Sequence, residues 1–86
     1  MKTYELKPNN RQKSFYGKAT VTEHDNGIIE LKSYDTIVCH IQNGIFERLW
    51  SGYSVTTMKH VNAFVDYYGI AGGGKVWWDG LEVVNN

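Results

Sequence analysis

The sequence has little of what builds covalent or membrane-bound scaffolds, since its 86 residues include one cysteine and one proline. A lone Cys39 excludes an intramolecular disulfide and argues against a disulfide-stapled secreted protein. Its apolar surroundings at 37–41 predict a buried, unreactive thiol. No stretch approaches the roughly 20 apolar residues that span a bilayer, and the N-terminus begins no apolar run. We therefore expect a cytoplasmic protein without membrane contact.

An excess of charge of either sign is also absent. Nine lysines and arginines balance nine acidic residues, so the formal net charge is zero. Domains that hold nucleic acid mainly through phosphate contacts usually carry a basic excess, which disfavours a nucleic-acid-binding module. Paired carboxylates, a nucleophile–base pair and a metal-ligand cluster are missing at usable spacing along the sequence. We therefore expect no enzyme, no cofactor and no metal site.

What the chain has instead is aromatic side chains. Phe, Trp and Tyr make up 14% of the sequence, a high share for one small domain of residues 1–86. In so small a domain some rings should remain partly exposed, which indicates an interface. Because the core is modest, a partner could add to the stability of the fold, and a homodimer or higher homo-oligomer would provide such a partner.

Strand-forming residues alternate with turn signals over the first 50 positions, which predicts an antiparallel sheet. Strands are expected at about 3–6, 15–23, 28–33, 36–42 and 45–50, with a polar loop over 7–14. After the second strand, a three-residue loop with Gly27 in the left-handed conformation pairs Val21 with Leu31. The two-residue alternative would place Glu23 opposite Glu30, a like-charge pair that costs free energy.

Asn43-Gly44 is the strongest short hairpin signal in the chain and predicts a type I′ turn. In the register that this turn sets, one face of the hairpin is more apolar than the other, and the more apolar face should meet the helix. The pairs expected on the apolar face are Ile41 with Phe46, Cys39 with Arg48 and Ile37 with Trp50. The pairs expected on the other face are Gln42 with Ile45, His40 with Glu47 and Val38 with Leu49. In this register His40 is a cross-strand partner of Glu47 rather than a metal ligand.

An amphipathic helix is expected at about 56–68. Thr56 is the preferred N-cap and Ser54 the second choice, while Gly69 is placed to end the helix as a left-handed C′ residue. Apolar residues recur at helical spacing and should face the sheet. This face holds Met58, Val61, Phe64, Val65 and Tyr68, whereas Lys59, His60, Asn62 and Asp66 should lie on the other side.

The tail at 70–86 is less clearly patterned. Gly72-Gly73-Gly74-Lys75 lacks the strand and helix that flank a phosphate-binding loop, so we interpret it as a connector. Trp78 and Leu81 at helical spacing predict a short turn that caps the core, followed by a brief strand, although a strand throughout is nearly as well supported. The whole chain then predicts an α+β fold, a small antiparallel sheet of four to five strands with two hairpins and one amphipathic helix on one face.

Four blocks of the sequence carry a resemblance to known proteins, at 4–8, 13–19, 31–38 and 48–64. The last is the most specific and contains the pattern Trp-x-Gly-Tyr-Ser-x-Thr-Thr-x-x-His-Val-Asn-x-Phe. In these blocks, over most of the first 70 residues, the chain resembles short uncharacterised proteins that phages and mobile elements of Gram-positive (Firmicutes) gut bacteria encode. The resemblance ends after Gly69. It implies an accessory protein of a mobile genome inside a bacterial host cell, and because such proteins carry no known activity, no catalytic residue is transferred.

The chemistry available lies where the helix begins. Hydroxyl side chains meet the free backbone N–H groups and the positive end of the helix dipole, a combination that binds anions. Trp50 and Tyr53 can stack on a ring of the partner. The alternative is purely structural, in which Thr56 caps the helix, Ser54 closes a turn and Trp50 belongs to the core. The candidate ligand- or partner-binding residues are Arg48, Trp50, Tyr53, Ser54, Thr56, Thr57, Lys59 and His60.

Three functional hypotheses follow from these observations. The first is a non-enzymatic inhibitor that blocks a host defence or regulatory protein through an aromatic surface. The second is a binder, or sponge, of a small phosphorylated or nucleotide ligand at the helix N-terminus. The third is the disfavoured nucleic-acid-binding module.

Overall fold

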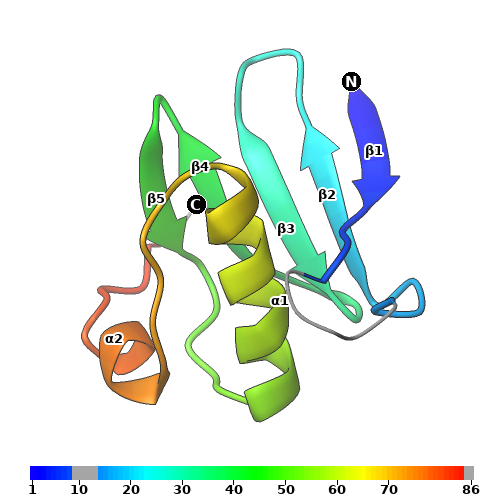
Figure 1. The fold of residues 1–86 in the computed structure, drawn as a ribbon. Helices are drawn as coiled ribbons and strands as arrows, with labels where there is room; N and C mark the ends of the chain where they lie inside the picture. Colours follow the sequence, from blue (N-terminus) through cyan, green and yellow to red (C-terminus); the bar gives the residue numbers. More distant parts are fainter. Residues whose placement is uncertain (9–13, 85–86) are drawn as a thin grey trace.

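An antiparallel meander organises the computed structural model, which describes residues 1–8 and 14–84. Over these residues the strands are β1 (Lys2–Glu5), β2 (Ala19–Glu23), β3 (Ile29–Ser33), β4 (Thr36–Gln42) and β5 (Ile45–Arg48). They lie side by side in chain order. Helix α1 (Val55–Tyr67) crosses one face of this sheet. The short helix α2 (Lys75–Asp79) lies beside the N-terminal end of α1 (Figure 1). The predicted α+β fold is confirmed.

The two hairpin registers are those that the turn residues predict. Val21 pairs with Leu31, and Gly27 has a φ of 90°, the left-handed conformation that the three-residue loop requires. In the β4–β5 hairpin, Asn43 and Gly44 have φ values of 54° and 77°, as a type I′ turn needs. The hairpin pairs Ile41 with Phe46, Cys39 with Arg48 and His40 with Glu47. His40 Nε2 lies 2.8 Å from Glu47 Oε1, so the predicted cross-strand pair forms.

A β-bulge corrects the predicted facing of strand β4. The β3–β4 register shifts after Leu31, because Leu31 pairs with Cys39 whereas Lys32 pairs with Ile37. Val38 is therefore the extra residue, and the side chains before it change faces. Val38 is 1% exposed and Ile37 is 38% exposed, so the expectation that Ile37 meets the helix and Val38 points away is wrong.

Strand β5 is also two residues shorter than expected. The backbone N–H groups of Leu49 and Trp50 both donate to the carbonyl of Val38, at 2.9 and 3.2 Å. Two residues thus oppose one at the bulge, and the predicted pairing of Ile37 with Trp50 does not form. The chain leaves the sheet here and turns toward α1 (Figure 1).

Strand β2 begins four residues later than the predicted start at Phe15. Phe15 is buried, but Tyr16 and Gly17 follow it with φ values of 55° and 74°. Lys18 N donates to Phe15 O at 3.0 Å and closes a tight turn before the strand. Of the predicted polar loop at 7–14, positions 9–13 lie outside the described residues.

The core lies between α1 and the sheet face beneath it. Met58, Val61, Phe64 and Val65 are buried there as predicted, and Tyr68 is half-buried. They pack with sheet residues that include Val21, Leu31, Cys39 and Ile41. Burial raises the pKa of the Cys39 thiol well above its usual value, which keeps it protonated and agrees with the predicted inert thiol.

The ends of α1 test the two capping predictions. Ser54, with φ −151° and ψ 153°, is the N-cap, and its Oγ accepts a hydrogen bond from Thr57 N at 3.0 Å. The preference for Thr56 is therefore wrong, because Thr56 already lies inside the first helical turn with its side chain exposed. At the other end Gly69 has a φ of 75°, and its N–H donates to Asp66 O, as a C′ glycine does.

The tail forms the predicted short turn and then touches the sheet. Trp78 in α2 is fully buried against the core. After α2, Val83 makes a single parallel bridge to Arg48 at the end of β5. Within the described residues, neither helix has the length and apolar character needed to cross a bilayer.

Candidate functional site

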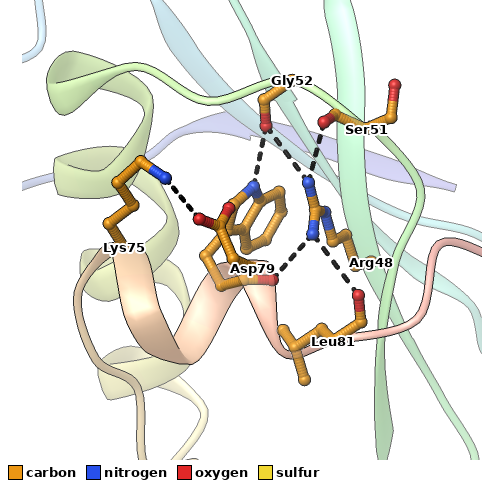
Figure 2. Close-up of polar contacts among 7 residues, drawn as sticks. Arg48, Ser51, Gly52, Lys75, Asp79 and Leu81 are labelled. Carbon is orange, nitrogen blue, oxygen red and sulfur yellow. Dashed lines mark hydrogen bonds and ion pairs between the residues drawn. The ribbon is translucent and has the colours of Figure 1, made fainter.

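Arg48, the last residue of β5, holds together the two segments that flank the start of α1. Its guanidinium is buried and donates to the carbonyls of Trp50 (2.8 Å), Ser51 (2.8 Å) and Trp78 (2.7 Å). Weaker contacts reach the carbonyls of Leu81 (3.3 Å) and Gly52 (3.5 Å). Figure 2 shows the guanidinium between the carbonyl oxygens of Ser51, Gly52 and Leu81. Arg48 is thus occupied in linking loop 49–54 to the tail.

The indole of Trp78 completes this linkage, which we call the Arg48 cage. The guanidinium carbon lies 4.6 Å from the centroid of the Trp78 ring, a cation–π geometry. Trp78 Nε1 donates to Gly52 O at 2.8 Å. Arg48 O in turn accepts from Val84 N at 2.8 Å. The cage therefore fixes the path of loop 49–54, which carries the predicted site residues Trp50, Tyr53 and Ser54.

Gly52 lets this loop fold back on Trp50. A Cβ atom built at Gly52 would lie 2.3 Å from Cζ2 of the Trp50 indole, far inside van der Waals contact. Any side chain here would displace the indole or the loop. The glycine of the Trp-x-Gly-Tyr sequence is thereby explained, because the backbone of Gly52 lies too close to the Trp50 ring for any side chain to fit.

Trp50 and the start of α1 border a hollow of about 270 Å³ that we call the Trp50 hollow. One wall comes from loop 49–54 and the first turn of α1, and the other from the end of β3, the β3–β4 turn and β4. Half of its lining consists of residues that the sequence predicted for the site. The lining residues are Ser33, Tyr34, Thr36, Val38, Trp50, Tyr53, Ser54 and Thr57.

Two of the lining residues belong to a buried polar network behind the hollow. Ser33 Oγ lies 3.0 Å from Thr57 Oγ1 and 2.8 Å from His60 Nδ1. All three residues are buried. The His60 ring packs edge-on against Phe15, with centroids 4.5 Å apart, and lies 5.8 Å from Tyr34. The network joins α1 to β3 through hydrogen bonds inside an otherwise apolar core.

This position corrects the expectation that His60 lies on the polar side of the helix. Its side chain is 1% exposed, because Ser33 supplies a buried hydrogen-bond partner from the sheet. Burial lowers the pKa of His60 from its ordinary value, since the imidazolium form would lose its hydration. The ring is therefore neutral at pH 7, and one of its nitrogens accepts while the other donates.

The family of the chain follows from a comparison with known protein families. A family of unknown function, DUF8033, matches residues 4–80. The chain belongs to the DUF8033 family. In this DUF8033 protein the match includes β2 to β5, both helices, the Arg48 cage through Trp78 and all of the Trp50 hollow. No curated protein and no solved structure matches the chain.

A second hollow, of about 260 Å³, adjoins the first on the far side of Tyr53. Lys59 and Asn62 of α1 line it together with Gly73 and Gly74. Lys75 lies near the same rim, with its Nζ 5.3 Å from the centroid of the Tyr53 ring. Lys75 forms an ion pair with Asp79 (Figure 2). Lys59 is the one charged residue of the lining, and among the described residues it forms no ion pair.

The DUF8033 fold thus separates the predicted site residues into several groups. Those that line the Trp50 hollow are Trp50, Tyr53, Ser54 and Thr57. Lys59 lines the adjoining hollow, and Thr56 is exposed on the first turn of α1 without lining either one. Arg48 is enclosed in its cage, and His60 lies behind Ser33.

Sequence reasoning missed the half of the site that β3 and β4 supply. Ser33 and Tyr34 precede Thr57 and His60 by more than 20 positions, so no local spacing relates them. One signal was present in the sequence, since Ser33-Tyr34-Asp35 interrupts the strand alternation and predicts a bend or a bulge, but it does not indicate which distant residues lie beside it. The described residues hold no group of His, Cys, Asp and Glu that could bind a metal ion.

Proposed function

We propose that this DUF8033 protein acts by binding rather than by catalysis, as an accessory protein of a mobile genome that inhibits a host defence or regulatory protein. The contact surface would be the end of the molecule where α1 begins. We call it the tyrosine end, after its three exposed tyrosines Tyr16, Tyr34 and Tyr53. The single observation that carries the proposal is the backbone conformation of Tyr34.

Tyr34 has a φ of 54° although its side chain is bulky. L-residues other than Gly, Asn and Asp adopt this left-handed region at a cost of about 1 kcal/mol or more. Asn43, in the β4–β5 turn of the same chain, has the same φ of 54° and illustrates the ordinary choice. Core burial does not offset the cost at Tyr34, because its side chain is 48% exposed. A contact outside the chain gives a reason to keep a tyrosine there.

Tyr16, in the turn before β2, is a second exposed tyrosine with a left-handed backbone. Its φ is 55° and its side chain is 74% exposed. The two turns lie together, since Tyr34 N donates to Lys18 O at 2.7 Å. Tyrosines are enriched in protein interfaces because they bring large contact area with few rotatable bonds. Two strained, exposed tyrosines in adjacent turns, one of which (Tyr34) lines a hollow, therefore support a protein-binding surface.

The buried Ser33–His60 pair does not favour catalysis over this proposal. A serine nucleophile needs an accessible Oγ and a base that a third group orients. Ser33 is buried, and no carboxylate among the described residues is hydrogen-bonded to His60. The pair is better suited to holding α1 on the sheet.

The proposal predicts that Tyr34→Asn weakens partner binding without harming the fold. Loss of an aromatic hot spot should reduce affinity at least about tenfold, or about 1.4 kcal/mol. The melting temperature should stay unchanged or rise, because asparagine suits the left-handed backbone. The measurement is capture of the host partner from cell extract by wild-type and variant protein at equal concentration, followed by titration of the captured protein.

Tyr67→Ala provides the matched control, because Tyr67 is an exposed tyrosine at the opposite end of α1. It should retain the partner. Native mass spectrometry of the purified protein shows separately whether the partner is a second copy of the chain. Equal capture by wild type and Tyr34→Asn would remove the tyrosine end as the contact surface.

A small phosphorylated ligand is the second candidate, and the hollow beside Lys59 favours it. The first turn of α1 carries no acidic residue that would repel an anion. If adenosine monophosphate binds there, it should raise the melting temperature of the wild type in a concentration-dependent way, and Lys59→Gln should reduce that rise. An equal rise in both proteins would place the nucleotide elsewhere, and no rise in the wild type would exclude it.

A further inference from the structure

We infer that the Trp50 hollow binds one neutral aromatic ring that carries a hydroxyl group, the phenol of a partner tyrosine. The inference rests on the proposed function, because it names the chemistry of the group that the partner inserts beside Tyr34. It is argued from the volume, the charge and the hydrogen-bonding groups of the hollow.

The volume of the hollow fits a single ring system. A cavity of roughly 150 Å³ accommodates benzene, whereas pockets for drug-sized ligands begin at roughly 300 Å³. The Trp50 hollow, at about 270 Å³, lies between these limits. It has room for one aromatic side chain and little more, so it suits an anchor residue of a larger partner better than a free cofactor.

The lining of the hollow selects an uncharged ring. None of its lining residues carries a charge, so a phosphate or an ammonium group would lose hydration there without gaining a counter-charge. Trp50, Tyr34 and Tyr53 offer ring faces and edges instead. Aromatic rings pack favourably on such walls in offset-stacked or edge-to-face arrangements.

The hydroxyl network behind the hollow selects a ring with a polar edge. If Nδ1 of the neutral His60 ring is unprotonated, Ser33 donates to it and Thr57 donates to Ser33, which leaves Thr57 Oγ1 an acceptor for the ligand. If Nδ1 carries the proton, it donates to Ser33, and one hydroxyl hydrogen of the Ser33–Thr57 pair is left to donate. A phenol both donates and accepts, so it matches either arrangement.

The experiment compares p-cresol, the side-chain analogue of tyrosine, with toluene, which lacks the hydroxyl. Both are titrated into the protein while backbone amide signals are followed by NMR. We expect saturable shifts at Tyr34, Gly52 and Ser54 in the wild type. In Thr57→Val the ratio of p-cresol affinity to toluene affinity should fall about two- to tenfold, the usual effect of one hydrogen bond.

Ser33→Ala serves as a second variant should Thr57→Val not fold, and Tyr67→Ala serves as the control with an unchanged ratio. Absence of saturable shifts, shifts confined to residues away from the hollow, or an unchanged ratio in the folded hydroxyl variant would overturn the inference. Failure of the proposed function gives a different result. In that case p-cresol would still bind the hollow, but Tyr34→Asn would capture the host partner as well as the wild type does.

Discussion

Arg48→Met is expected to lower the free energy of unfolding by about 3–5 kcal/mol. Methionine fills most of the volume of arginine but donates no hydrogen bond, so the carbonyls of Trp50, Ser51 and Trp78 lose close donors together. The buried Trp78 carbonyl left without this donor costs about 1–3 kcal/mol, and the half-buried carbonyls of Trp50 and Ser51 add smaller amounts because water can reach them. The three losses share one side chain and are not independent, which holds the total below their sum. Urea titration followed by tryptophan fluorescence measures the change.

Lys75→Ala is the matched control, because Lys75 lies close to the same cage, yet its side chain is 61% exposed and forms an ion pair with Asp79 (Figure 2). Exposed ion pairs of this kind contribute little to stability, so this variant should unfold at nearly the wild-type urea concentration. If Arg48→Met cost less than about 1 kcal/mol, the cage would not hold loop 49–54 to the tail.

Phe64→Ala is expected to destabilise the protein by a similar amount, about 3–5 kcal/mol, for a different reason. Phe64 is fully buried between α1 and the sheet and packs edge-on against Tyr68, with ring centroids 5.3 Å apart. Its truncation loses the transfer free energy of the ring and leaves a cavity that a two-layer fold cannot close. Thermal and urea unfolding of the variant would both report the loss.

The loss is large relative to the whole, since domains of this size are stable by only about 5–15 kcal/mol. Tyr67→Ala tests whether the effect belongs to the buried face, because Tyr67 lies on the same helix as Phe64 but is exposed. It should change the urea midpoint much less. A Phe64→Ala cost below about 1 kcal/mol would contradict the packing of α1 on the sheet.

The parts of the fold that sequence reasoning predicted are those with local physical causes. Asn43-Gly44 and Gly27 set the hairpin registers because only certain residues tolerate the left-handed conformation that those turns demand. The face of α1 that includes Val61 and Phe64 follows from helical periodicity. These determinants act within about ten positions of one another, so they can be read from one sequence.

The parts that were wrong depend on contacts between distant segments. The bulge at Val38 reverses the facing of the β4 residues before it, and it forms where Leu49 and Trp50 both donate to the same carbonyl. A regular alternation cannot reveal such a defect. His60 and Ser33 illustrate the same limit, because His60 is buried with a hydrogen-bond partner that lies 27 positions away in the sequence.

Half of the candidate site was accessible to prediction for a similar reason. Trp50, Tyr53, Ser54 and Thr57 are close in sequence, and the start of a helix brings them together. Arg48 was assigned to the same cluster because of its charge. The carbonyls that occupy its guanidinium come partly from the tail, whose path the sequence did not define.

The Arg48 cage also bears on the order in which the segments of the chain can fold. The five strands pair with one another in chain order, so the meander can assemble while later residues are still being synthesised. Trp78 and Leu81, in contrast, follow Arg48 by 30 and 33 positions. The ribbon of strands can therefore form before residues 78–81 are made, whereas the path of the loop around Trp50 is fixed only once those residues reach Arg48.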